Sequence, residues 1–353
     1  MNTYNILPKV AISVGDTNGI GYEIILKTLA NKDILDLFTP VIFGSTKHLN
    51  HCKNQLDLKE VQFHGIPTLD KIAPNKINVV NIWKEPATME VGTATEASGK
   101  MAFESLQAAA DAVKNGICDL LVTAPINKNN IQSEDFNFPG HTEYLGKVWG
   151  GNPLMFLVSE QLKVSLATQH LPLAEVPKNI QAKSITQKIQ ALNNSLVQDF
   201  GISRPKIAVL GLNPHAGDGG LLGSEENEII QPAIQEMYNK GMLVYGPYAA
   251  DSFFTSNANN FDAVLGMYHD QVLTPFKTIC FEEGVNYTAS LPFVRTSPDH
   301  GVAYDIAGKG IADETSFREA AYTAIQIFKK RAEYQELTSN VLKSHNLKLD
   351  RDR

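Results

Sequence analysis

The chain has 353 residues, of which 43% are hydrophobic and 20% charged, and its 31 Lys and Arg against 38 Asp and Glu give a net charge of −7. This length is enough for about two domains of ~150 residues each, and the acidic balance excludes a general binder of nucleic acids or anionic membranes. The longest apolar runs are far below membrane-spanning length, and residues 1–15 contain no basic segment before a long apolar stretch, so we expect a cytoplasmic protein. Three cysteines without CxxC spacing predict neither a disulfide framework nor a cysteine zinc site.

Short apolar runs alternate with segments of helical periodicity along the chain. This alternation predicts an α/β fold with a largely parallel sheet. The predicted strands are residues 9–14, 40–43, 77–80, 118–123, 153–158, 163–167, 206–210 and 262–267.

Two helices are predicted with particular clarity. Apolar residues recur at helical spacing from Phe103 to Val113, and Asn115-Gly116 then supplies a stop signal. A second stripe runs from Phe317 to Phe328, with acidic residues before it and basic residues after it, as the helix dipole favours. The polar tail at 333–353 is expected to be peripheral. Because the chain has no repeats and no Gly/Ser linker, we expect its two domains to share a sheet or to interleave.

A glycine-rich turn, Gly15-Asp16-Thr17-Asn18-Gly19-Ile20-Gly21, follows the first predicted strand and opens a helix. Its spacing is GxxxGxG, which differs from the GxGxxG fingerprint of dinucleotide-binding folds. The pattern is compatible with a ligand-binding loop that presents amide groups and equally with a plain tight turn. A Walker A motif is absent, because Ser98-Gly99-Lys100 is followed by Met101 inside a helical pattern.

The nine histidines fall into two groups. His48, His51, His64 and His345 lie in polar, turn-like surroundings and are predicted to be surface residues. The other five, His141, His170, His215, His269 and His300, lie beside Pro, Gly or acidic residues in loop motifs.

Three of these five, His170, His215 and His269, follow directly after predicted strands. The carboxyl-terminal ends of strands are where open α/β sheets bind ligands. Three imidazoles meeting there could hold a divalent cation and leave positions open for substrate, as catalytic metal sites do. The alternative is that each is an ordinary hydrogen-bonded loop histidine.

Residues 268–305 contain the densest group of chemically active side chains, including Lys277, Asn286, Arg295 and the Asp299-His300 pair. Lys, Arg and Asn together can hold a phosphate or a carboxylate. On an acidic chain, such a local basic group indicates a small anionic substrate, with surface salt bridges as the alternative.

The sequence resembles the 4-hydroxythreonine-4-phosphate dehydrogenases of vitamin B6 (pyridoxal phosphate) biosynthesis over nearly its whole length. The resemblance is carried by residues 15–23, 122–128, 138–145, 168–173, 211–220, 268–277 and 285–308, above all by Asn213-Pro214-His215-Ala216-Gly217 and Tyr268-His269-Asp270-Gln271. It implies a divalent metal, such as Zn, Mg or Co, on His170, His215 and His269, at a homodimer interface where one ligand comes from the partner. It also implies that His141, Thr142, Lys277, Asn286 and Arg295 bind a phosphorylated hydroxy-acid substrate.

The same resemblance implies the fold of the isocitrate and isopropylmalate dehydrogenases, with two α/β/α domains around a central cleft and NAD or NADP bound without a GxGxxG loop. On this basis residues 1–130 and 301–353 would form the first domain, and residues 131–300 the second. The segment 300–313 is similar to the loop that holds the adenosine end of the cofactor, which implicates His300, Gly301, Asp305 and Asp313. Relatives usually have Asn-Pro where this chain has Asp313-Glu314, and acidic residues near a 2′-phosphate would repel it, so NAD is favoured over NADP.

The resemblance implies oxidation of the secondary alcohol of 4-phosphohydroxy-L-threonine, followed by decarboxylation of the resulting β-keto acid. Lys277 and Asp270 are both candidates for the general base, and the sequence does not separate them. Two alternatives stand beside this interpretation. One is a dehydrogenase of D-threonate or D-erythronate 4-phosphate, and the other is a three-histidine metal hydrolase or lyase that needs no nicotinamide.

Overall fold

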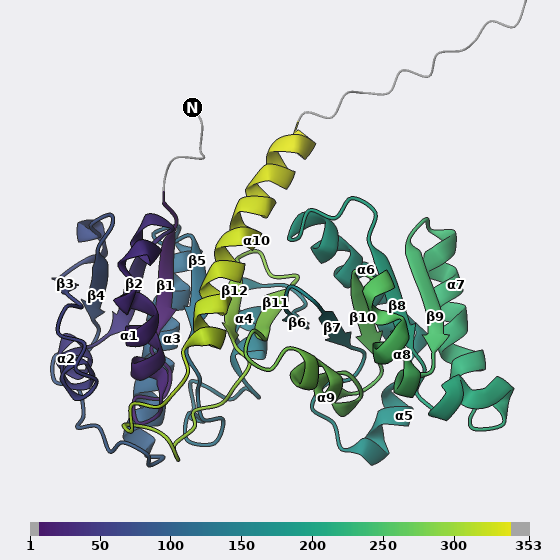
Figure 1. Ribbon diagram of the computed structural model, residues 1–353, viewed down its shortest axis with the longest axis horizontal. Helices are drawn as coiled ribbons and strands as arrows, with labels where there is room; N and C mark the ends of the chain where they lie inside the picture. Colours follow the sequence, from purple (N-terminus) through teal and green to yellow (C-terminus); the bar gives the residue numbers. More distant parts are fainter. Residues whose placement is uncertain (1–6, 340–353) are drawn as a thin grey trace, which may run out of the picture.

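A single sheet of twelve strands runs through the whole molecule in the computed structural model, which describes residues 7–339 (Figure 1). Its strand order is β3-β4-β2-β1-β5-β12-β11-β6-β7-β10-β8-β9. Most neighbouring pairs are parallel, whereas β11 runs antiparallel to both β12 and β6, and β6 runs antiparallel to β7. The strands are β1 (Lys9–Ser13), β2 (Thr39–Gly44), β3 (Phe63–Ile66), β4 (Ile77–Asn81), β5 (Leu120–Thr123), β6 (Leu154–Val158), β7 (Lys163–Leu166), β8 (Lys206–Leu210), β9 (Leu243–Tyr248), β10 (Ala263–Gly266), β11 (Val285–Ala289) and β12 (Arg295–Pro298).

The structure confirms the predicted α/β fold and contains a strand at each of the eight predicted positions. Four further strands, β3, β9, β11 and β12, carry too few apolar residues in sequence to stand out. β11 and β12 are short and rich in polar residues, because one face of each lies on the core and the other faces a pocket.

The helices are α1 (Gly21–Ala30), α2 (Thr46–Gln55), α3 (Glu96–Lys114), α4 (His141–Trp149), α5 (Val176–Asn179), α6 (Ala182–Gln198), α7 (Gln231–Asn239), α8 (Ala250–Ser256), α9 (His269–Ile279) and α10 (Thr315–Ser339). Helix α3 shows why sequence signals at the ends of a helix predict where it begins and ends. Thr95 accepts a hydrogen bond from the amide of Ser98 in a capping box, and Gly116 follows the helix with a positive φ of 70°. The predicted stop at Asn115-Gly116 is therefore confirmed.

The two faces of the sheet are covered differently. On one face a single apolar cluster contains residues of α1, α6, α7 and α10 and extends across the sheet. On the other face the core is divided into a cluster with α3 and α4 and a cluster with α8 and α9. The middle strands β11 and β12 lie between these two smaller clusters.

Helix α10 extends well past the predicted stripe and stands against the middle of the sheet, where it contacts β5, β11 and β12 (Figure 1). Near its C-terminal end, the buried Arg331 donates to Asp199 at 2.6 Å and to the hydroxyl of Tyr287 at 2.8 Å. The expected peripheral tail begins within this helix, and residues 340–353 lie outside the described residues. Because the sheet is continuous, the division into residues 1–130 with 301–353 and residues 131–300 stays a prediction.

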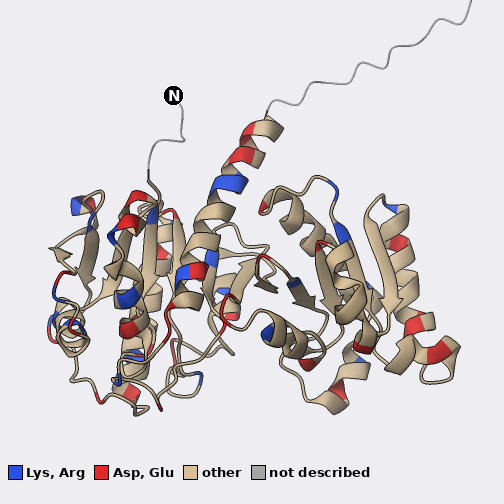
Figure 2. Cartoon of the chain, viewed as in Figure 1, with Lys and Arg blue, Asp and Glu red and all other residues tan. Residues whose placement is uncertain are grey.

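Acidic and basic residues are intermixed over both halves of the described chain (Figure 2). Within residues 7–339, no helix has the length and apolar character needed to cross a membrane. Cys52, Cys118 and Cys280 are free thiols.

Candidate active site

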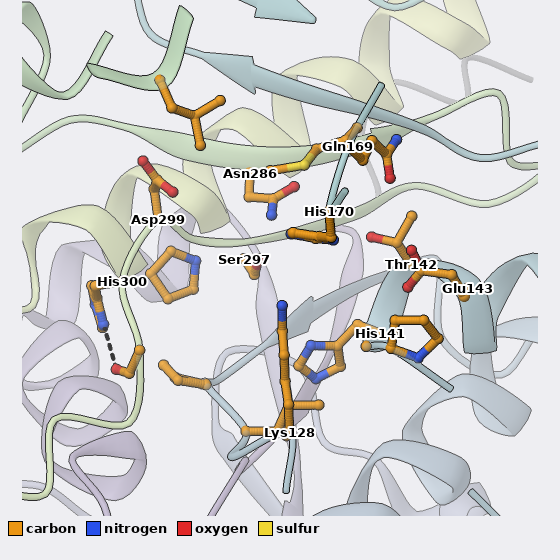
Figure 3. A pocket seen from close by; sticks show the side chains of 18 of the residues that line it. Lys128, His141, Thr142, Glu143, Gln169, His170, Asn286, Ser297, Asp299 and His300 are labelled. Carbon is orange, nitrogen blue, oxygen red and sulfur yellow. Dashed lines mark hydrogen bonds between the residues drawn. The ribbon is translucent and has the colours of Figure 1, made fainter. Parts of the chain in front are cut away.

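A cavity of about 330 Å³ opens over the middle of the sheet, on the face opposite α10. Side chains alternate along the two central strands: Thr296 of β12 bonds to the backbone of α10, whereas Arg295 and Ser297 line the cavity. The N-terminal end of α4 and the helix α9 form its walls, and Figure 3 shows His141, Thr142 and Glu143 of α4 at the cavity. The divided core on this face therefore leaves room for a ligand.

The guanidinium of Arg295 lies at the base of this cavity and is only 2% exposed. It donates to the hydroxyl of Thr123 at 2.7 and 3.2 Å and to that of Thr288 at 3.0 Å. Within the described residues it forms no ion pair. Burial lowers its pKa to about 9, against the opposing influence of Glu143, so the group is still a cation at neutral pH. A buried cation held only by neutral hydroxyls is suited to binding an anion.

Two predicted substrate residues, His141 and Thr142, are the first residues of α4, where the backbone amide groups have no partner within the helix. The Nε2 atom of His141 is buried and has no hydrogen-bond partner. Burial, Arg295 and Lys128 hold the pKa of His141 well below its usual range, so the ring is neutral near pH 7. The position of these groups beside Arg295 matches an anion site.

Unpaired polar atoms recur around the cavity. Besides His141 Nε2, the buried atoms Asn286 Oδ1 and His300 Nε2 also have no partner in the described structure. A buried polar atom without a partner costs free energy unless a ligand or water satisfies it. These atoms converge on the space where the sequence predicted a substrate.

The two candidates for the general base occupy different positions. Lys277 lines the cavity, donates to the carbonyl of Asp299 at 3.0 Å and lies 3.3 Å from its carboxylate. Burial raises the pKa of Asp299, although Lys277 opposes the shift. Asp270 instead lies outside this cavity with an exposed carboxylate, 2.7 Å from Nδ1 of His269. Lys277 thus faces the pocket directly, whereas Asp270 is placed to orient His269.

The three predicted metal histidines follow β7, β8 and β10, which are adjacent parallel strands. The rings of His170 and His269 lie in the cavity with their centroids 5.7 Å apart. His215 instead opens into a second hollow, of about 830 Å³, which Asp270 also lines. Between residues 7 and 339, no three His, Cys, Asp or Glu side chains come together as a metal site. One chain therefore brings two of the three predicted ligands together.

Metal binding requires neutral imidazoles. Burial lowers the pKa of His170, and the charges of Lys128 and His269 add to this, against Glu143. His170 is thus held in the neutral state that a metal ligand needs, and its ring lies close to that of His269.

The backbone around His215 is held in an uncommon conformation. His215, Ala216 and Asp218 have positive φ values of 53°, 51° and 44°. A positive φ at a non-glycine residue costs roughly 1–2 kcal/mol of conformational energy. It persists only where the surrounding contacts hold the backbone in place, often at functional sites. Here the buried carboxylate of Glu226 accepts hydrogen bonds from the amides of Leu212 and Asn213, both at 2.7 Å. The turn therefore presents His215 on a fixed support.

The predicted cofactor segment begins in the cavity and leaves it. His300 and Gly301 line the cavity, whereas Asp305 is exposed. Asp313 is also exposed, and its carboxylate accepts the amide of Thr315 at 2.7 Å at the start of α10. Hydrogen bonds from the side chain and the amide of Thr315 lower the pKa of Asp313.

The glycine-rich turn at 15–21 packs against this same segment. The amide of Ile20 donates to the carbonyl of Val302, and a Cβ on Gly19 would lie 2.1 Å from the side chain of Val302. A Cβ on Gly15, which has a φ of 67°, would lie 2.2 Å from the carbonyl oxygen of Pro125. The glycines are needed for close packing of backbone, which favours the tight-turn interpretation.

The sequence interpretation missed several residues and misplaced one. Lys128, Glu143 and Gln169 line the cavity but were not chosen. Lys128 could have been found, because it follows β5 as the histidines follow their strands. His48, predicted to be a surface residue, is buried, and its Nε2 lies 2.9 Å from the carbonyl of Ala87. His51 is exposed and His64 half-buried, while His345 lies outside the described residues.

The α/β fold and its buried cationic pocket define an enzyme for a small anionic substrate. The model of the family described as pyridoxal phosphate biosynthetic protein PdxA matches residues 36–324. The chain belongs to this family and is an oxidoreductase. The family implies a nicotinamide cofactor and a divalent metal.

Known proteins of similar sequence and structure agree with this placement. A 4-hydroxythreonine-4-phosphate dehydrogenase of Bacteroides thetaiotaomicron is 48% identical over 97% of each chain. A D-threonate 4-phosphate dehydrogenase of Cupriavidus necator is 36% identical over 92% of this chain and 99% of its own. The crystal structure of 4-hydroxythreonine-4-phosphate dehydrogenase from Klebsiella pneumoniae has a TM-score of 0.81 and 34% identity, covering 92% of this chain and 99% of that one.

Proposed function

We propose that this protein oxidises 4-phosphohydroxy-L-threonine to 2-amino-3-oxo-4-phosphooxybutanoate, which loses carbon dioxide to give 3-amino-2-oxopropyl phosphate in pyridoxal phosphate synthesis. The observation that carries the proposal is Arg295, a buried guanidinium that faces the cavity without an acidic partner. A phosphorylated substrate supplies the anion that this group lacks. The similarity to the Bacteroides enzyme supports the amino-acid substrate.

In this proposal the phosphate binds between Arg295, the first residues of α4 and the side chains of Lys277 and Asn286. Arg295 donates through its planar fork, and the amide groups at the start of α4 provide further donors. Neutral His141 contributes a hydrogen bond without a second charge, because its pKa is held low. The existing contacts of Arg295 with Thr123 and Thr288 orient the guanidinium before the substrate arrives.

A divalent metal, zinc, magnesium or cobalt, fits the pair His170 and His269, which are close together and face the cavity. A third ligand would be His215 of a second copy of the chain, because in one chain it opens into a separate hollow. A homodimer with its active site at the subunit interface would satisfy this requirement. When bound, the metal would supply Lewis acidity, lowering the pKa of the substrate hydroxyl and stabilising negative charge on that oxygen.

Lys277 and Asp270, the two candidates for the general base, have different roles in this proposal. Lys277 is the better placed base, because its side chain lines the cavity and its nitrogen, as a neutral amine, could accept the proton of the substrate hydroxyl. Asp270 would hold the ring of His269 in orientation through its 2.7 Å contact. The nicotinamide would enter beside His300 and Gly301, with NAD preferred to NADP because Asp305 and Asp313 add negative charge along the same segment.

A second substrate class has specific support, because the Cupriavidus relative is named for D-threonate 4-phosphate. D-erythronate 4-phosphate belongs to the same class. These sugar acids share the phosphate, the hydroxyl and the carboxylate with the amino-acid substrate and lack only its amine. Family membership argues against the three-histidine hydrolase or lyase.

The test measures reduction of NAD and of NADP by the purified protein with each of the three phosphorylated acids, with and without a chelator. We expect turnover of 4-phosphohydroxy-L-threonine that the chelator abolishes and a divalent metal restores. Turnover of only the sugar-acid phosphates would assign the protein a function in sugar-acid catabolism. A lack of reduction with all three acids would refute the proposal. The cytoplasmic location stays a prediction, to be tested by fractionation.

A further inference from the structure

Lys128 projects into the middle of the cavity from the loop that follows β5. Figure 3 shows its side chain rising beside His141, with the ammonium group pointing into the open space of the pocket. Its stem passes close to Gly140, since a Cβ there would lie 3.8 Å from Cε of Lys128. The side chain therefore runs past the start of α4, where the phosphate is proposed to bind.

Hydrogen bonds hold the loop that carries Lys128 in place on both sides of this residue. The carbonyl of Lys128 accepts a hydrogen bond from Gln132 at 2.8 Å. On one side, Asn127 accepts from the amide of Asn129 at 2.8 Å. On the other side, Asn130 donates to the buried carboxylate of Asp16 at 2.8 Å. The backbone of Lys128 is thus fixed, and only its side chain is free to adjust.

The two lysines of the cavity differ in their partners. Lys277 is engaged by the carbonyl and carboxylate of Asp299. Nζ of Lys128 has no ion pair and no hydrogen bond within the described part of the chain. Such a free ammonium, on a fixed loop and inside a pocket, is available to the substrate.

The surroundings of Lys128 show which part of the substrate it would meet. Lys128 lines the cavity together with His141, in the phosphate region, and His170, in the histidine pair, and in Figure 3 its ammonium group lies between these two rings. Lys128 therefore lies between these two regions. A substrate with its phosphate at Arg295 and its hydroxyl toward the histidine pair would pass its oxidised carbon by this ammonium group.

We propose that Lys128 is a further catalytic residue, whose ammonium group contacts the oxygen on the carbon that is oxidised. This inference rests on the proposed function. When carbon dioxide leaves, the carbon–carbon bond breaks, its electron pair forms a double bond to the carbonyl carbon, and the π pair of the carbonyl moves to the oxygen. Lys128 donates a proton to that oxygen to give the enol. The enol carbon then takes a proton from water while the oxygen returns its own to Lys128, which leaves the ketone and a net uptake of one proton.

Phosphate binding alone does not need this lysine. Arg295, Lys277 and the amide groups of α4 already provide donors for the phosphate. Interactions made mainly in the transition state lower kcat when they are removed, whereas uniform binding interactions raise KM. The two roles can therefore be separated by kinetics.

The experiment compares Lys128→Met and Lys128→Arg with the unchanged protein, using the phosphorylated acid that the unchanged protein oxidises best. We expect Lys128→Met to lower kcat by about 100-fold, as for the loss of one preorganised donor, with KM within about threefold. Lys128→Arg, which keeps the charge, should recover part of kcat. Lys147→Met, on the exposed side of α4, is the matched control and should leave both constants unchanged.

A second measurement does not depend on turnover. Calorimetric binding of the same substrate without nicotinamide should give a Kd for Lys128→Met within about threefold of the unchanged protein. Both Lys128 variants should also keep the unfolding temperature, because Nζ makes no hydrogen bond or ion pair to residues 7–339 that would support the fold. A raised KM and Kd with kcat retained would overturn the inference, as would normal kinetics in Lys128→Met. Failure of the unchanged protein with every substrate would instead refute the proposed function itself.

Discussion

Replacing Arg295 by Met should separate the function of this residue from its contribution to stability. The guanidinium is 2% exposed and is held by two threonine hydroxyls. Methionine fills much of the same space without the charge. Removing a buried cation that has no acidic partner relieves its desolvation penalty, while Thr123 and Thr288 each lose a hydrogen bond. We therefore expect the free energy of unfolding to change by less than about 2 kcal/mol.

Substrate binding should respond much more strongly. A hydrogen bond to a charged group contributes roughly 1.5–3 kcal/mol, and a two-pronged contact with phosphate makes two of them. For the two hydrogen bonds together we take the lower end of this range, about 3 kcal/mol, because Lys277 and the α4 amide groups remain to bind the phosphate. This corresponds to a roughly 150-fold weaker Kd for the phosphorylated substrate, at 1.36 kcal/mol per tenfold change.

Ligand-induced stabilisation gives a direct assay. At a substrate concentration of 100 times the Kd of the unchanged protein, binding should raise its free energy of unfolding by about 2.7 kcal/mol. The same concentration should stabilise Arg295→Met by only about 0.3 kcal/mol. Arg295→Lys, which keeps a charge but loses the planar fork, should lie between the two.

Two results would refute this reasoning. Substrate stabilisation of Arg295→Met equal to that of the unchanged protein would show that the guanidinium does not bind the anion. A loss of more than about 4 kcal/mol in the unfolding free energy without substrate would show that Arg295 mainly supports the fold.

Three further predictions follow from the same structure. If the metal site spans two subunits, inactive His170→Ala and His215→Ala proteins should recover activity when mixed and reassembled, and no recovery under conditions that exchange subunits would argue against shared ligands. Because the pKa of His141 is held low in the folded state, the unfolded chain binds a proton there below about pH 6.5 and the folded chain does not. The free energy of unfolding should then fall as pH drops, by up to about 1.4 kcal/mol per pH unit, and urea titrations of His141→Asn should show a shallower fall. Arg331→Met should lower the unfolding free energy by about 3–5 kcal/mol because it leaves Asp199 buried without its cation, and Arg331→Met with Asp199→Asn should recover part of that loss.

The sequence by itself determined the main features of the fold, because local patterns carry them. Eight buried strands are apolar runs, and α3 has its cap and stop in its own residues. Open α/β sheets bind ligands at the carboxyl-terminal ends of their strands, and we call this the strand-end rule. It singled out His170, His215 and His269, which follow three strands that the structure shows to be adjacent. Periodicity and capping act over a few residues, so they can be read without knowing the partners of each segment.

The tertiary structure decided which of these side chains meet. The strand-end rule gives the same edge for all three histidines, but only His170 and His269 share a pocket, since the left-handed turn directs His215 into another hollow. The strands β11 and β12 are too short and polar to be recognised alone, yet their pairing in the middle of the sheet places Asn286 and Arg295 in the cavity. Lys128 lies far from both in sequence and shares the cavity with them because it is on the loop that follows β5. Burial and charge at a site depend on such long-range packing, which no local pattern encodes.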